Sequence, residues 1–390
     1  MFRLVFALAA ALGFGLAAMA EVSQGPKNVP SFKPAFKNQT RAPAMKVPAL
    51  KVETIAQGLE NPWGIAVLPN GNYLVTERPG RLNYIQRNGK VPRIAGAPKV
   101  FVKSQGGLLD VAIADDFATS RRIFLTYAKP AGGGRSSTAA ATAVLSKDFS
   151  RLTGLKDIFV QTPATKRTKH FGSRIVIDGR HAYITTGDRG DMPSAQALSN
   201  TQGVVVRIGL DGSIPGNNPF VGQGRARPEI WSYGHRNPQG ADLHPRTGEL
   251  WTLEHGPAGG DELNLIRAGG NYGWPVVSYG EDYDGSPIGR GRTSAQGVEE
   301  PRYYWDPVIA PGGFAFYDGD LFPWKGDIIA ASLNPGGIHR LKMKGTRVVG
   351  ESAFLDNLRR VRDIEIDRDG AILALAERRT GVLVRITPGG

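Results

Sequence analysis

The sequence feature that most constrains the fold is a short unit that recurs along most of the chain. Each copy combines a strand of alternating apolar residues, a turn, and a second strand that ends in a polar or acidic residue. The six copies span residues 64–77, 109–127, 173–188, 240–254, 313–332 and 363–377. Repeated strand pairs of this kind are typical of β-propellers, in which each repeat is one blade. The sequence therefore predicts an all-β fold, a six-bladed β-propeller.

The two ends of the repeat region support a closed ring. Residues 51–55 and 382–386 both look like strands, and they can pair within one blade. The 51 glycines and 27 prolines fit many short strands joined by turns. Uneven intervals between the repeats place long insertions at residues 190–235 and 260–310. A solenoid or a pair of β-sandwiches would use similar strands and stays open as an alternative.

The first 48 residues do not follow the repeat. Residues 1–20 have a basic start, an apolar run and the ending Ala18-Met19-Ala20, which are typical of a secretory signal peptide cleaved after Ala20. A retained membrane anchor is the alternative, although the run is short for a span. No later stretch is apolar enough for stable membrane insertion. From the signal peptide we expect export to the periplasm, with a secreted protein as the alternative. Residues 21–48 are rich in Pro, Lys and Ala and suggest a flexible leader or a surface strap, with the propeller domain over 49–390.

Cysteine usage and charge narrow the function. The chain has no cysteine, which excludes disulfides, covalent haem attachment and zinc sites built on thiolates. The formal net charge of +13 favours anionic ligands, an acidic envelope surface or an acidic redox partner, although a generally basic proteome would explain it as well. No nucleic-acid recognition motif is present, so we expect no nucleic-acid partner.

The position of each residue within the repeat predicts where reactive groups gather. The start of the first strand and the end of the second lie at the same edge of a blade, and these edges together form one mouth of the central channel. The residues at these two positions include Gln105, His170, Asp188, Arg189, Arg236, Asn237, His255, Gly256, Pro257, Asn334, Arg360 and Arg362. Taken singly, each has a simpler explanation as a strand cap, a turn or a solvated charge. Together they predict a basin that suits a flat, carboxylated ligand, because arginine binds carboxylates in a bidentate manner.

At these residues the sequence resembles the glucose/sorbosone dehydrogenase family, which includes soluble aldose sugar dehydrogenases. The resemblance runs from about residue 50 to the end and keeps the order of its motifs. The segments that carry it are 61–64 (NPWG), 105–109 (QGGLL), 170–174 (HFGSR), 187–190 (GDRG), 234–240 (GHRNPQG), 254–257 (EHGP), 261–264 (DELN), 270–275 (GNYGWP) and 360–363 (RVRD). The resemblance implies a six-bladed propeller that oxidises aldose sugars to lactones with pyrroloquinoline quinone (PQQ) and Ca²⁺, and passes electrons to an unidentified acceptor.

The resemblance also implies roles for individual residues. His170 would be the general base, and hydride would pass to a quinone carbon whose carbonyl is polarised by Arg236 and calcium. The cofactor would be held by Gln105, Arg189, Asn237, Asn334, Arg360 and Arg362. The carbonyl oxygens of Gly256 and Pro257 would bind the calcium at the cofactor. A second, structural calcium would use Glu262, the backbone at Tyr272 and Asp261.

Two departures from the family pattern bear on the substrate. Lys169 stands where the best-known glucose-oxidising member has an acid, and Asn334 stands where that member has a lysine that reaches the quinone. Two other functions remain open for a propeller of this kind: a calcium-dependent lactonase or esterase, and a non-catalytic binder of envelope glycans. A lactonase would need several carboxylates around its metal, whereas the arginine-rich basin favours the quinone.

Overall fold

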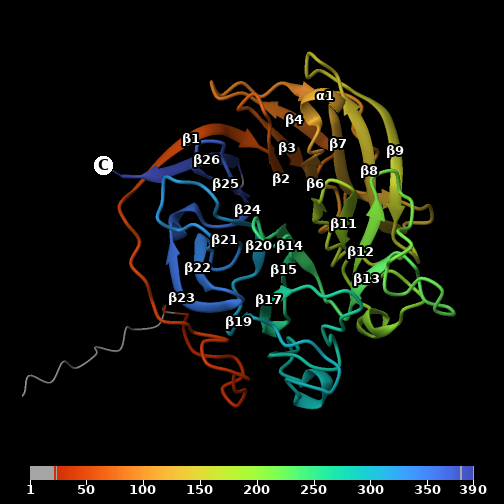
Figure 1. The fold of residues 1–390 in the computed structure, drawn as a ribbon, viewed down its shortest axis with the longest axis vertical. Coiled ribbons are helices and arrows are strands. Elements are labelled where there is room, and N and C mark those ends of the chain that lie inside the picture. Colours follow the sequence, from red (N-terminus) through yellow and green to blue (C-terminus); the bar gives the residue numbers. More distant parts are fainter. Residues whose placement is uncertain (1–21, 23, 378–379, 390) are drawn as a thin grey trace, which may run out of the picture.

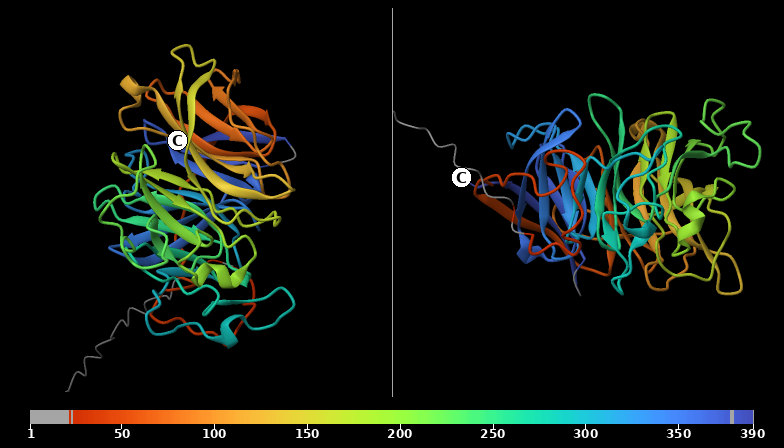
Figure 2. Two further views of the ribbon diagram at one scale, coloured as in Figure 1. Left: turned by 90° about the vertical axis from the view of Figure 1, so that its right-hand side faces the viewer. Right: turned by 90° about the horizontal axis from the view of Figure 1, so that it is seen from below.

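The computed structural model describes residues 22, 24–377 and 380–389, so the predicted signal peptide lies outside the described residues. Six four-stranded antiparallel sheets stand as blades around a central axis, which confirms the predicted six-bladed β-propeller (Figure 1). Helical structure within the described residues is limited to α1 (Phe117–Ser120) and the short 3₁₀ turns η1 (Met192–Gln196), η2 (Ile288–Gly291) and η3 (Asp356–Leu358). The strands cross the thickness of the ring, and long connections extend beyond them at both faces (Figure 2).

The blades follow one another in chain order. Blade 1 contains β2 (Pro62–Val67), β3 (Tyr73–Glu77), β4 (Arg81–Ile85) and β5 (Arg93–Ile94), and blade 2 contains β6 (Leu108–Ile113), β7 (Arg122–Pro130), β8 (Ser136–Leu145) and β9 (Leu152–Val160). Blade 3 contains β10 (Ile175–Ile177), β11 (His181–Thr185), β12 (Val204–Gly209) and β13 (Ile230–Tyr233), and blade 4 contains β14 (Pro238–Leu243), β15 (Leu250–Glu254), β17 (Asp261–Leu265) and β19 (Tyr303–Trp305). Blade 5 contains β20 (Pro311–Phe316), β21 (Ile328–Ser332), β22 (Ile338–Lys344) and β23 (Arg347–Phe354). A small extra sheet joins β16 (Ala258–Gly259) to β18 (Gly280–Glu281).

Blade 6 closes the ring with both ends of the repeat region. It contains β24 (Val361–Ile366), β25 (Ile372–Ala376) and β26 (Gly381–Pro388), and its outermost strand is β1 (Leu50–Leu59). Strand β1 pairs antiparallel with β26, from Leu50 opposite Pro388 to Leu59 opposite Gly381. The predicted pairing of the two ends is therefore confirmed, and it ties the first propeller strand to the last.

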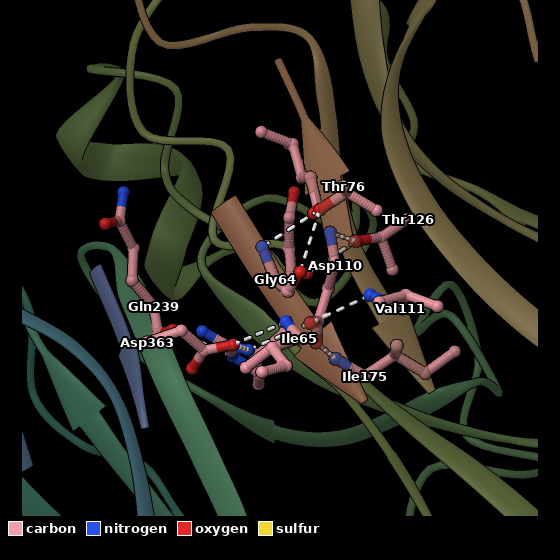
Figure 3. Close-up of polar contacts among 12 residues, drawn as sticks. Gly64, Ile65, Thr76, Asp110, Val111, Thr126, Ile175, Gln239 and Asp363 are labelled. Atoms are coloured by element: carbon pink, nitrogen blue, oxygen red, sulfur yellow. Dashed lines mark hydrogen bonds and ion pairs between the residues drawn. The ribbon is translucent and has the colours of Figure 1, made fainter. Parts of the chain in front are cut away.

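Threonines on second strands link neighbouring blades near the axis. In blades 2 and 3, the hydroxyls of Thr126 and Thr185 donate to the carbonyls of Ser173 and Pro238 in the next blade, at 2.6 and 2.8 Å. Thr76 makes the same link from blade 1 to blade 2 (Figure 3). These repeated bonds explain why one residue type returns at one position of the repeat.

Aspartates on alternate first strands add a second set of links. Asp110 accepts from the backbone N–H of Ile175 at 2.8 Å, and Asp363 accepts from that of Ile65 at 3.0 Å (Figure 3). Asp242 accepts in the same way from Phe316 at 2.9 Å. The inner strands of adjacent blades are thus joined by buried hydrogen bonds rather than by side-chain packing alone.

A buried ion cluster crosses the channel. Arg174 Nη1 lies 2.8 Å from Asp110 Oδ1 and 3.0 Å from Asp363 Oδ2. Burial raises the pKa of Asp110 to about 7, although the charge of Arg174 opposes this. In blade 5, the position that corresponds to Arg174 in blade 3 is Gly313, where a Cβ would lie 1.7 Å from Asp363 Oδ1. Glycine therefore leaves the space that the ion cluster fills.

The ion cluster borders a cavity of about 250 Å³ in the channel. The guanidinium of Arg174 stacks on Trp63 at 4.7 Å, and Trp63 lines the pocket at the other mouth of the channel. The stacked Arg174–Trp63 pair therefore lies between the two cavities and forms the floor of the pocket described below.

The described part of residues 21–48 lies against blades 4 and 5. The backbone N–H groups of Asn28 and Val29 donate to the carboxylate of Asp306 at 2.8 and 3.0 Å. Met45 N donates to Glu351 O at 2.8 Å, and Ala42 is fully buried in the core between these blades. This segment follows the propeller as a strap from residue 24 onward.

Candidate active site

Six residues predicted for catalysis or cofactor binding come together in one pocket of about 240 Å³ at a mouth of the channel. These are Gln105, His170, Arg236, Asn237, Arg360 and Arg362. The pocket is also lined by Trp63, Arg78, Gln239, His255, Tyr283, Ala310, Leu333 and Glu377. The contributions come from all six blades and their connections, as the repeat position predicts.

His170 is held in place by its backbone and by its neighbours. It lies between β9 and β10 with a φ of 54°, in the left-handed region that a non-glycine residue adopts at a cost in energy. Its N–H donates to the side chain of Gln105 at 2.7 Å. A Cβ at Gly187 would lie 2.2 Å from the His170 carbonyl oxygen, so only glycine allows this close approach. Backbone strain and close packing thus fix the direction of the imidazole.

Asp188 orients the ring of His170. Its Oδ1 lies 2.6 Å from His170 Nδ1, and its Oδ2 accepts from the indole N–H of Trp274 at 2.8 Å. A carboxylate accepts only, so Nδ1 carries the proton and Nε2 is left with the lone pair. The pair therefore has the arrangement of a general base with its orienting acid.

Burial and two nearby positive charges keep the histidine neutral. Burial lowers the pKa of His170 below its usual 6.5, the hydrogen bond to Asp188 opposes this, and the charges of Arg236 and Lys169 add to the lowering. For Asp188, burial would raise the pKa, but the hydrogen bond from His170, the backbone hydrogen bond from Gly190 and the charge of Arg236 outweigh it and lower the pKa. A neutral imidazole beside an ionised carboxylate is the state in which His170 can accept a proton.

The rest of the pocket is strongly positive. Arg78, Arg236, Arg360 and Arg362 line it, against the single carboxylate of Glu377. Glu377 lies 2.7 Å from Arg362, 3.1 Å from Arg78 and 3.4 Å from Arg360. Burial would raise the pKa of Glu377, but the charge of Arg362 outweighs it and lowers the pKa.

Arg236 has bonding capacity left over. Its Nη1 donates to the His255 carbonyl at 3.2 Å, while its buried Nε has no hydrogen-bond partner within the described residues. A buried donor without a partner is costly. An unpaired arginine donor and an excess of positive charge are features that a carboxylated ligand such as PQQ satisfies, so these residues fit that cofactor.

His255 is a second histidine in the same pocket. Its Nε2 lies 3.2 Å from Gln239 Oε1, which also accepts from Arg362 Nη1 at 2.7 Å. Burial, together with the charges of Arg362 and Arg236, lowers the pKa of His255 well below its usual value. His255 is therefore a neutral hydrogen-bonding group.

Next to the pocket lies a small cavity of about 10 Å³. Gly256, Pro257, Glu262 and Tyr272, all predicted for metal binding, line it, and so does Glu254. The volume is that of about one water molecule or ion. Burial raises the pKa of Glu262 well above its usual value, and the charge of Glu254 adds to this. Carbonyl and carboxylate oxygens are the donors that Ca²⁺ prefers, so the donor set fits a calcium ion.

Among the residues that the structure describes, no group of three or more His, Asp or Glu side chains is arranged to hold a metal. The predicted calcium at the cofactor would be bound by backbone carbonyls, which are not part of such a side-chain group. This calcium therefore stays a prediction. Asp261 does not line the small cavity. Its carboxylate accepts from the N–H groups of Gly256, Ile309 and Ala310 at 2.7–2.8 Å, and thus holds the backbone around the cavity.

Two predicted cofactor residues lie elsewhere. Arg189 is fully buried, stacks on Phe171 at 3.7 Å, and donates to the carbonyls of Lys169, Arg167 and Ser136. It therefore holds the loop that carries His170 and does not line the pocket. Asn334 lines a neighbouring cavity instead.

Sequence reasoning missed several residues of the site. Asp188 was placed at the mouth but not paired with His170, and Arg78, Glu377 and Trp63 were not assigned. Glu377 directly follows the second strand of the last repeat, β25, so the positional rule that selected Asp188 could have selected it as well. Tyr283 comes from the turn at residues 281–285, and its hydroxyl accepts from Arg236 at 3.2 Å.

A propeller with an oriented histidine base in an arginine-lined pocket defines an enzyme that acts on or with an anionic ligand. The family model described as "Glucose / Sorbosone dehydrogenase" matches residues 59–385. The chain belongs to the glucose/sorbosone dehydrogenase family. Helices long and apolar enough to span a membrane do not occur in the described part of the chain.

Individual relatives agree with this assignment. The chain is 39% identical over 346 residues to "Aldose sugar dehydrogenase YliI" of Escherichia coli (strain K12), covering 87% of this chain and 93% of that protein. The solved apo structure of the soluble aldose sugar dehydrogenase from Escherichia coli has a TM-score of 0.85 at 38% identity and covers 87% of this chain and 100% of that chain. The PQQ-bound aldose sugar dehydrogenase of Streptomyces coelicolor has a TM-score of 0.74 at 25% identity, covering 88% and 99%.

Proposed function

We propose that this chain is a PQQ- and calcium-dependent dehydrogenase that oxidises aldose sugars to lactones. The observation that carries the proposal is the buried His170–Asp188 pair, which faces a pocket lined by four arginines in a chain of this family. The names of the relatives support the same chemistry. Bound PQQ would supply the two-electron acceptor that takes hydride from the sugar carbon.

The chain's own residues would do the remaining work. His170 Nε2 accepts the hydroxyl proton of the sugar, and Asp188 stabilises the imidazolium that forms. Arg236, which has an unpaired Nε, stabilises negative charge that develops in the pocket. Arg362 and Arg360 hold carboxylates of the cofactor, and the carbonyls of Gly256 and Pro257 would hold the calcium.

Reconstitution tests this proposal. Purified mature protein is supplied with PQQ and Ca²⁺, and dye reduction is followed over a panel of aldoses. We expect His170→Ala to lose sugar-dependent reduction by at least about a hundredfold, the usual minimum for a general base. The variant should still bind PQQ in an absorbance titration. His181→Ala is the matched control, because His181 also pairs with an aspartate, at 3.2 Å, but lies outside the pocket.

The outcomes separate the possible functions. Failure of the wild type to bind PQQ would overturn the proposal and favour a glycan-binding propeller. Retained dye reduction in His170→Ala would overturn the role of the histidine. Removal of Ca²⁺ by a chelator should abolish reduction, and full activity in the chelated protein would contradict the calcium requirement.

The cellular location is part of the proposal. The basic start, apolar run and small-residue ending of residues 1–20 support export to the periplasm. Cell fractionation tests it: the mature chain should appear in the periplasmic fraction without residues 1–20. A full-length chain in the cytoplasm would contradict export.

A further inference from the structure

A cavity next to the arginine-lined pocket has no role in the chemistry above. It has a volume of about 600 Å³ and lies between the strap and blade 5. Apolar groups form most of its surface. Its apolar lining includes Val308, Ile309 and Phe354, and its polar lining includes Asn334 and His339.

Only a thin wall separates this cavity from the arginine-lined pocket. Ile309 lines the cavity and the next residue, Ala310, lines the pocket; Leu333 lines the pocket and the next residue, Asn334, lines the cavity. The two segments are hydrogen-bonded to each other, because Leu333 N and Asn334 N both donate to Ile309 O at 3.2 Å. The wall is thus one layer of backbone thick, and groups on its two sides are close neighbours.

A histidine–carboxylate pair stands at the side of the cavity. His339 on β22 places Nδ1 2.8 Å from Glu351 Oε1, and Glu351 also accepts from the Trp305 indole at 2.8 Å and the Tyr303 hydroxyl at 2.6 Å. Within the described residues Nε2 of His339 has no hydrogen-bond partner, although the ring is buried and lines the cavity. The geometry repeats that of His170, Asp188 and Trp274 on the other side of the wall.

The shape and chemistry of the lining indicate one class of ligand. A flat ring suits a mainly apolar cavity, and oxygen atoms on that ring need hydrogen-bonding groups in the lining. His339 and Asn334 are such groups, and the Asn334 amide makes no hydrogen bond within the part of the chain that the structure describes. A dehydrogenase also needs an acceptor for the two electrons of each turnover.

We propose that this cavity binds a benzoquinone-type electron acceptor, which takes the electrons of sugar oxidation across the wall. This inference rests on the proposed function. Oxidation of a hydroxyl to a carbonyl releases two electrons and two protons, and reduction of a quinone to a hydroquinone takes up the same number. One proton passes from solvent to the nearer quinone oxygen through His339 Nε2, while Glu351 stabilises the positive charge that the ring carries in transit, and solvent at the open side supplies the other proton directly.

The test combines a binding and a turnover measurement. Binding of 2,3-dimethoxy-5-methyl-1,4-benzoquinone is titrated on the protein without added cofactor. Turnover is then measured on the reconstituted enzyme with aldose, with either this quinone or ferricyanide as oxidant. Ala353→Trp fills the cavity from an exposed position on β23, and Lys342→Trp is the matched control at an exposed position outside the lining.

We expect Ala353→Trp to weaken quinone binding and to raise the KM for quinone at least tenfold, while its rate of ferricyanide reduction stays within twofold of wild type. In Lys342→Trp, quinone binding, the KM for quinone and ferricyanide reduction should all stay within twofold of wild type. His339→Gln should lower kcat with the quinone more than with ferricyanide. Equal quinone binding in wild type and Ala353→Trp overturns the site. Quinone binding without quinone reduction, in an enzyme that reduces ferricyanide, overturns the acceptor role. If the reconstituted wild type does not reduce ferricyanide, the dehydrogenase function is refuted. The binding titration, which needs no turnover, then still shows whether the cavity binds the quinone.

Discussion

Replacement of Asp188 by Asn tests the catalytic geometry most directly. In the native pair, Asp188 accepts three hydrogen bonds: from His170 Nδ1 at 2.6 Å, Gly190 N at 2.6 Å and Trp274 Nε1 at 2.8 Å. An asparagine has one acceptor oxygen and one donor nitrogen. In one orientation its NH₂ faces the indole N–H of Trp274. In the other it faces Gly190 N–H and Nδ1 of His170, and it then forces the imidazole proton onto Nε2.

The size of the effect follows from these bonds. Loss of a hydrogen bond to a charged group costs about 1.5–3 kcal/mol, and a buried donor left without a partner costs about 1–3 kcal/mol. Together they predict a barrier higher by about 2.5–6 kcal/mol, which is a loss of about 10²–10⁴ in kcat/KM. We expect this loss in dye-coupled turnover of the reconstituted enzyme, with PQQ affinity within threefold of wild type, because Asp188 does not line the pocket.

A matched variant controls for the substitution itself. Asp178 also pairs with a histidine, His181, at 3.2 Å, but the pair is partly exposed on blade 3. Asp178→Asn should leave kcat/KM within twofold of wild type. If Asp188→Asn keeps kcat/KM within threefold while its circular dichroism and melting temperature stay native, the assignment of His170 as an oriented base is refuted.

Four further predictions test the site and its framework. Because the pKa of His170 is below 6.5, kcat/KM should be flat at neutral pH and fall only below about pH 6.5 as the base becomes protonated; a fall that begins above pH 7 would contradict this. Stability should fall in the same acid range, because the unfolded chain binds a proton at His170 more readily than the native one. Gly313→Ala places a Cβ 1.7 Å from Asp363 Oδ1 and should lower the free energy of unfolding in urea by about 1–3 kcal/mol, whereas Gly216→Ala, with nothing within 4 Å, should not. Arg189→Met should lower the unfolding free energy by about 2–4 kcal/mol and leave PQQ affinity within threefold; loss of affinity with unchanged stability would return Arg189 to the cofactor site.

The repeat pattern was sufficient to predict the fold and the face that carries the site. Strand periodicity and turn residues are local properties, so six strand pairs and the closing pair at the ends could be recognised without tertiary information. The position of a residue within the repeat assigns it to one edge of a blade, which is why Gln105, His170 and Arg236 were correctly placed at one pocket. The rule depends only on the geometry of a hairpin.

The tertiary structure decided which way each side chain points. Arg189 and His170 both lie in loops at this mouth and both have a positive φ, of 58° and 54°. The His170 ring nevertheless lines the pocket, whereas the Arg189 side chain is buried in the interior. Asn334 follows its strand as predicted but faces the cavity on the other side of the wall. Asp188 was visible at the right position, but its bond to His170 spans two loops of irregular backbone. Repeat position is set by sequence periodicity, whereas side-chain direction in a loop depends on backbone angles and on packing against residues distant in sequence, which periodicity does not contain.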